Sequence, residues 1–362
     1  MPDDLPRTLH STIETYIREV EVDILNSRKL TALLEANGRI EMDMGGDEVK
    51  WPVQYRRHKP KGWADGDTET FEPKDRFKTA KLDWRGYTIG DMVTKKQRLM
   101  NKGVNAIIDI WSRVTDDLMD DMREDFGDEL LIDGGLTANY KRLCGIETFM
   151  ADDGSVAATD LVAFPDDTYA GIKTKRAAYG GTWTTGTYPD GHGDAHYDFY
   201  SPILVNYTSS NWIDSSNDTW AKTALLAMRA GILWSRKRKS RQGMLNMIML
   251  EQKMYREFLA LLDPKEKLEV RRGEPRGLVA LGFDDVVNFD GVDVTWEYGM
   301  PSDTGYGFNI NHMGLWSLQE GLFVPEGPDY DLATKKWQFS VDMMGQAWFR
   351  PRYFVKFFKY AT

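Results

Sequence analysis

The longest regular pattern of apolar positions in this sequence lies between residues 101 and 133. Apolar side chains recur there at intervals of three or four, at Val104, Ile107, Ile108, Trp111, Val114, Leu118, Met122 and Phe126. This spacing predicts a helix with one apolar face, which Gly134 and Gly135 end. About 30 residues at 1.5 Å each give a rod of roughly 45 Å. We expect the helix to pack through Ile107, Trp111, Val114, Leu118 and Met122.

A long hairpin is predicted just before this helix. Apolar residues alternate with polar ones from Val49 to Tyr55 and again from Ala80 to Ile89, which is the period of a strand. Pro52 cannot donate to a ladder, so the first strand is predicted at a sheet edge. Residues 56–78 between the strands are mostly polar. An isolated two-stranded hairpin is only marginally stable in water.

We therefore expect this hairpin to lie across another subunit. Its contacts would come from its aromatic side chains, namely Trp51, Trp63, Phe71 and Trp84. The alternative is a loop that folds back onto its own domain.

Shorter patterns organise the rest of the chain. Residues 1–48 carry an apolar stripe at helical spacing but little else, so this arm needs some other surface to cover it. From Thr219 a second helix is predicted, followed by a buried strand at Met244 to Leu250 and a third helix, which suggests an α/β lobe over roughly 200–285. The remaining residues are rich in strand patterns and end in one predicted strand from Trp348 to Tyr360. The fold class predicted is α+β.

Charge narrows the classes of function. The net charge of −10 argues against a general nucleic-acid binder. The second half of the long helix carries eight carboxylates, which we expect to form a solvated face. The aromatic and basic stretch 348–360 could stack on nucleic acid, but a half-buried strand explains it more simply.

One cysteine, Cys144, excludes an internal disulfide, and no apolar run reaches the ~18 residues of a membrane span.

Candidate catalytic chemistry is sparse. His192 and His196 are four apart, a spacing that binds metal on a helix, but Gly191 and Gly193 argue against a helix there. No nucleophile motif, phosphate-binding loop or dinucleotide fingerprint is present. We therefore predict no catalytic residue, cofactor or metal site, and keep a metal-dependent enzyme using His192 and His196 as the less favoured alternative.

The order of these parts resembles one family, the major capsid protein of tailed bacteriophages of the Hong Kong 97 (HK97) type. The similar features are the arm, the aromatic hairpin, a transition from Met92-Val93 to Asn101-Lys102-Gly103, the long helix, the α/β lobe and the strand-rich return. Local similarities lie at residues 291–294, at Met300-Pro301 before a strand from Tyr306 to Asn309, and at Gln346 to Arg352.

The resemblance implies an HK97-type fold with five parts. Residues 1–48 would be the N-arm, 49–98 the extended E-loop, 99–199 the P-domain with its spine helix at 101–133, 200–285 the A-domain, and 286–362 a return mainly to the P-domain. The implied function is structural. Subunits would form hexamers and pentamers that close into an icosahedral shell around phage double-stranded DNA, in virions made in the bacterial host cytoplasm.

The resemblance also implies partners. These are copies of the chain itself, a portal protein, a decoration protein in some relatives, and packaged DNA bound without sequence specificity, with no membrane. The long cleaved scaffolding segment of some members is not seen ahead of the arm, so a separate scaffold protein is expected. An encapsulin-like nanocompartment shell, which shares the fold, is the alternative function.

Overall fold

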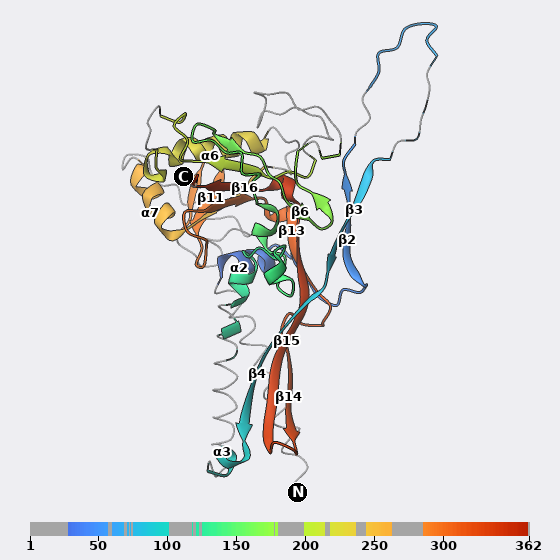
Figure 1. The fold of residues 1–362 in the computed structure, drawn as a ribbon, viewed down its shortest axis with the longest axis vertical. Coiled ribbons are helices and arrows are strands. Elements are labelled where there is room, and N and C mark those ends of the chain that lie inside the picture. Colours follow the sequence, from blue (N-terminus) through green and yellow to red (C-terminus); the bar gives the residue numbers. More distant parts are fainter. Residues whose placement is uncertain are drawn as a thin grey trace.

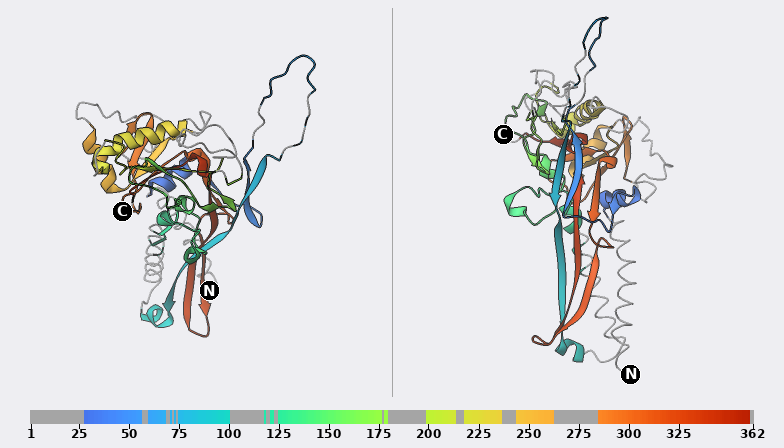
Figure 2. Two further views of the ribbon diagram at one scale, coloured as in Figure 1. Left: turned by 45° about the horizontal axis from the view of Figure 1, so that its top comes forward. Right: turned by 90° about the vertical axis from the view of Figure 1, so that its right-hand side faces the viewer.

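The described residues form a broad body with two projections (Figure 1). The computed structural model describes residues 28–56, 60–68, 71, 73, 75–100, 118, 121–122, 125–176, 178–179, 199–213, 218–236, 244–262 and 285–360. Long strands extend from the body in one direction, and a hairpin extends from it in another, as the views of Figure 2 also show.

The long projection is part of a five-stranded sheet built around one strand. Its members are β1 (Ile40–Glu41), β4 (Arg85–Thr94), β13 (Met313–Ser317), β14 (Val324–Asp331) and β15 (Lys336–Phe349). The 14-residue β15 pairs with β4 along most of its length, and on its other side with β14 and then β13. β4 therefore leaves the predicted hairpin at Trp84 and joins this sheet.

The body holds a seven-stranded mixed sheet in the order β10-β11-β9-β12-β16-β8-β5. Its strands are β5 (Val162–Ala163), β8 (Ile203–Asn206), β9 (Met247–Leu250), β10 (Val287–Phe289), β11 (Val292–Trp296), β12 (Gly305–Phe308) and β16 (Val355–Phe358). Every residue of β8, β9 and β12 is buried, as expected for strands covered on both faces. The helices α6 (Trp220–Arg236) and α7 (Gln252–Leu261) pack against each other and contact this sheet.

The smaller elements complete the described chain. Two-stranded sheets are formed by β2 (Glu48–Gln54) with β3 (Phe77–Asp83), and by β6 (Thr168–Tyr169) with β7 (Ile172–Lys173). The short helices are α2 (Lys29–Ala36), α3 (Lys95–Met100), η1 (Thr137–Asn139), η2 (Ile146–Phe149), η5 (Ile310–His312) and η6 (Pro351–Tyr353). The turn between β10 and β11 is a tight two-residue turn: Asp290 and Gly291 both have positive φ, at 50° and 84°, as a type I′ hairpin turn requires.

The described end of the long helix is shorter than predicted. Residues 118, 121–122 and 125–129 are helical, and the helix ends at Glu129, four residues before the predicted end. The Leu130 carbonyl accepts the N–H of Ile146 (2.9 Å) instead of continuing the helical ladder. Leu118 and Met122 are buried, as predicted, at 7% and 3% exposure. Ile107, Trp111 and Val114 lie outside the described residues.

Two further predictions need correction. Of the acidic helix face, Asp121, Asp125 and Asp128 are exposed, but Glu129 is only 6% exposed and does not belong to a solvated face. The C-terminal stretch is not one strand either. Trp348 lies in β15, and after the turn at η6 the chain enters β16 in the other sheet, since Pro351 supplies no backbone N–H to continue a ladder.

The described part of the predicted arm packs on its own chain. Leu30, Leu33 and Leu34 of α2 are each 3% exposed or less and belong to the same core as Phe126. Arg28 fixes the start of this helix by donating to the Tyr298 carbonyl (2.8 Å). Residues 1–27 lie outside the described part, so the covering of the rest of the arm by another surface stays a prediction.

Candidate assembly surface

The hairpin of β2 and β3 carries the most exposed aromatic surface of the described chain. The strands pair antiparallel from Glu48–Asp83 to Gln54–Phe77, and the described residues of the connecting segment reach well away from the body (Figures 1 and 2). Exposure is 65% for Trp63, 89% for Phe71 and 52% for Phe77. The described part of the chain therefore leaves these aromatic side chains largely uncovered.

The other two predicted contact residues lie at the root of the hairpin. Trp51 is 6% exposed and packs between Tyr169 and Trp348, with ring centroids 6.2 and 6.3 Å away. Trp84 is half-buried, and its Nε1 donates to the Gly46 carbonyl (2.8 Å). In the isolated chain both tryptophans therefore anchor the hairpin to its own body, while Trp63 and Phe71 remain uncovered.

A buried glutamine also holds the root. Gln346 of β15 is 0% exposed, its Nε2 donates to the Asp83 carbonyl (2.9 Å), and its Oε1 accepts the N–H of Cys144 (3.1 Å). One side chain thus joins the end of β3, the 143–146 turn and β15. Sequence reasoning missed this residue, although a single glutamine inside an apolar run (Met343 to Phe349) is typical of a buried side chain that satisfies backbone groups.

A polar cluster joins the end of the long helix to β4. Glu129 accepts hydrogen bonds from the Tyr87 hydroxyl (2.5 Å) and from Arg142 Nε (2.8 Å). Burial, together with the hydrogen bond to Glu129, raises the pKa of Tyr87, so its phenol stays protonated and acts as a donor. This cluster fixes where the long helix meets the long sheet.

A second group of carboxyls lies nearby, in the 133–167 segment. Burial raises the pKa of Asp133 and raises that of Asp167 to about 6, and the Glu147 carboxylate adds to both shifts. Lys356 offsets part of this negative charge through an ion pair with Glu147 (2.8 Å). The free energy of unfolding of the body therefore depends on whether these carboxyl groups are protonated.

The described residues offer little for catalysis. Among them, no three His, Cys, Asp or Glu side chains are placed to hold a metal ion. Cys144 is buried, and burial raises the pKa of its thiol, which disfavours the reactive thiolate. His192 and His196 lie outside the described part. Among the described helices, none combines the length and the apolar character that a membrane span requires.

No protein-family model and no curated protein sequence matches the chain, whereas solved structures do. The capsid asymmetric unit of cyanophage A-1(L) aligns with a TM-score of 0.54 and 14% identity over 91% of this chain and 92% of that one. The mature capsid of bacteriophage PhiM1 aligns with a TM-score of 0.51 and 10% identity over 90% of this chain and 87% of that one. The capsid of a native GTA particle aligns with a TM-score of 0.50 and 11% identity over 91% of both chains.

These alignments span about nine tenths of the sequence. The α+β class and the HK97-type fold expected from the order of parts are confirmed. The chain has the fold of phage capsid proteins.

Proposed function

We propose that this chain is a major capsid protein whose copies form hexamers and pentamers of an icosahedral shell around phage double-stranded DNA. One observation carries the proposal. The chain matches the fold of a phage capsid protein over 91% of its length, and it also extends a hairpin whose Trp63 and Phe71 are exposed. Repeated copies could cover that surface, each hairpin lying across a neighbour. In this proposal the protein has a structural role and no catalytic one, and it is a component of the virion.

Electron microscopy of the expressed protein tests this proposal. We expect closed particles of uniform size, alone or after co-expression with a scaffold protein, which we propose is a separate chain. Portal and decoration proteins would join the same shell. Particles that copurify with a cargo enzyme would favour the encapsulin-like alternative. A small monodisperse monomer under every assembly condition would contradict the proposal.

Protease treatment offers an independent check. Residues 56–78 should be cleaved in free subunits and protected in particles, because assembly would cover the hairpin. Equal cleavage rates in both states would mean that the hairpin contacts no neighbour.

A further inference from the structure

The far end of the long sheet carries a group of basic side chains that we call the lysine tip, namely Lys95, Lys96, Lys335 and Lys336. The first two begin α3, and the other two lead from the β14–β15 turn into β15. The Lys95 N–H donates to the Lys335 carbonyl (3.1 Å), which holds these two segments side by side (Figure 1). Residues 92–100 and 332–336 contain five basic side chains and no carboxylate, in a chain whose net charge is −10.

The charge of the lysine tip is not neutralised by its own chain. Lys95, Lys96 and Lys335 are exposed, and among the described residues none of them makes an ion pair. The carboxylates beside them bind their own backbone instead. Asp331 accepts the N–H of Ala333 (2.8 Å), and Asp91 accepts the N–H of the residue that follows it (2.6 Å). The ammonium groups therefore remain available to another molecule.

Apolar side chains lie exposed around the same end of the sheet. Exposure is 80% for Leu332, 63% for Leu99 and 47% for Met92. The Lys336 ammonium lies 3.1 Å from the Met92 sulfur, so charge and apolar surface are in contact here. A surface of this kind is complementary to a partner that is both acidic and apolar.

The end of the hairpin has this complementary chemistry. Residues 63–75, which we call the acidic tip, contain five carboxylates and one lysine. Asp65 and Asp75 are exposed and make no ion pair within the described chain. Trp63 and Phe71 of the same segment are 65% and 89% exposed. The acidic tip and the lysine tip thus each present unpaired charges of one sign next to exposed apolar surface.

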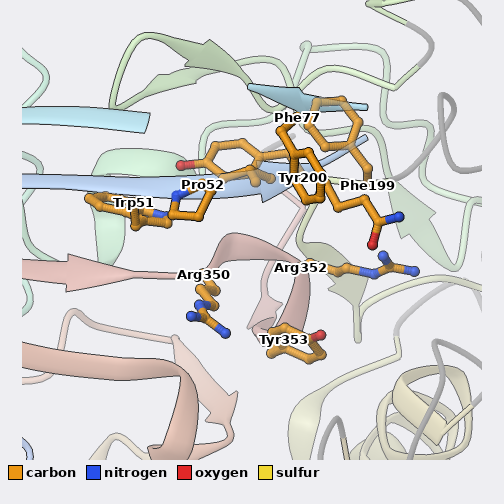
Figure 3. A pocket seen from close by; sticks show the side chains of 10 residues that line it. Trp51, Pro52, Phe77, Phe199, Tyr200, Arg350, Arg352 and Tyr353 are labelled. Atoms are coloured by element: carbon orange, nitrogen blue, oxygen red, sulfur yellow. The ribbon is translucent and has the colours of Figure 1, made fainter. Parts of the chain in front are cut away.

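The two tips cannot meet within one chain. The hairpin and α3 lie at opposite ends of the molecule in all three views of Figures 1 and 2. Packing at the root holds the hairpin in this direction, since Trp51 lies between Tyr169 and Trp348. Figure 3 shows Trp51 and Pro52 across a recess from Tyr353 of the body. A partner for either tip therefore comes from another molecule.

We infer that the lysine tip of one copy binds the acidic tip of another copy's hairpin. The two surfaces are different parts of the chain, so the contact is heterologous, and contacts of this type close rings of subunits. Each copy would use both of its tips, which multiplies an interaction whose single exposed ion pairs are weak. This inference rests on the proposed function and names the surface on which the hairpin ends.

Charge reversal tests the contact. The lysine variant Lys95→Glu/Lys335→Glu should keep the melting temperature of free subunits, because both side chains are exposed and unpaired. It should lower the fraction of subunits in particles by roughly tenfold or more. Lys173→Glu/Lys359→Glu, at two exposed lysines of the body, makes the same change in net charge and should assemble normally.

Normal assembly of the lysine variant would overturn the inference and leave the proposed function standing. Equal losses in the lysine variant and its control would attribute the effect to net charge and would also overturn the inference.

A charge swap identifies the partner surface. The hairpin variant Asp65→Lys/Asp75→Lys should assemble as poorly as the lysine variant, whereas a chain with all four substitutions should regain most of the wild-type assembly. Asp67 is left unchanged because it accepts the N–H of Ala64 (2.9 Å) within the hairpin. A fourfold variant that assembles no better than either double variant would show that the two tips do not meet.

A mixture of the two double variants tests the contact without particles. Each variant alone has two tips of like charge, but a tip of one variant is complementary to the other tip of its partner. Sedimentation velocity should therefore detect a mixed complex that neither variant forms alone. If the wild type forms no particles, the proposed function fails, while the mixed complex would still support the contact and its absence would overturn it. A DNA duplex that binds the wild type but not the lysine variant, with no mixed complex, would assign the lysine tip to nucleic acid instead.

Discussion

The carboxylate of Glu129 accepts a 2.5 Å hydrogen bond from the hydroxyl of Tyr87, which ties the end of the long helix to β4. The same hydroxyl accepts the N–H of Leu143, a buried residue of the following turn. One phenol therefore satisfies a buried carboxylate and a buried backbone donor.

Replacing Tyr87 with Phe should lower the free energy of unfolding by about 2–4 kcal/mol, because a hydrogen bond to a charged group is lost and a buried N–H is left without an acceptor. Urea denaturation of free subunits measures this. Tyr140→Phe, at a tyrosine that is 59% exposed, is the control and should change stability by no more than about 0.5 kcal/mol. Equal losses in both variants would show that the joint is not specific.

Gln346→Leu should cost about 3 kcal/mol or more, since the Asp83 carbonyl and the Cys144 N–H would both lose their partner in a buried site. The exposed Gln338 of the same strand provides the control, Gln338→Leu, with little expected change. We also expect faster proteolysis near the hairpin root in Gln346→Leu. Unchanged stability and cleavage would mean that water replaces the glutamine.

Trp63→Ala/Phe71→Ala should leave the melting temperature of free subunits unchanged, because neither side chain packs on its own body. The same variant should assemble poorly, as measured by the sedimenting fraction. Leu136→Ala, which removes an exposed apolar side chain outside the hairpin, is the control. If the double variant had a lower melting temperature than the wild type, the hairpin tip would pack on its own domain.

Asp167→Asn should change how stability depends on pH. Burial raises the pKa of Asp167 from 3.8 to about 6, so the folded state binds this proton more tightly than the unfolded chain does. The resulting stabilisation is fully present below 3.8 and is lost as the pH rises through about 6. Relative to the Asn variant, the wild type should thus lose about 1–2 kcal/mol between about pH 4 and pH 7, after allowance for the solvent that screens this partly exposed group.

Denaturation curves at the two pH values check this, with Asp152→Asn at an exposed turn as the control. A pH dependence in the Asn variant equal to that of the wild type would exclude Asp167 as its source.

Local pattern predicted much of this protein. The alternation from Val49 to Tyr55 predicted β2, the apolar run from Met244 contains β9, and helical spacing predicted α6 and α7. The order of these parts was enough to indicate the capsid fold. Such elements are readable because the side-chain period of a helix or strand is set within a few residues.

Only the tertiary structure decided which strands share a sheet. β12 and β16 lie between β9 and β8, although they follow them by many residues, and β15 and β16 separate into two sheets across a short turn. It also decided that Trp51 anchors the hairpin while Trp63 remains exposed, and that Glu129 is buried. These outcomes depend on contacts between segments that are far apart in the sequence. Such contacts form only when the whole core packs, so the local periodicity of the sequence does not predict them.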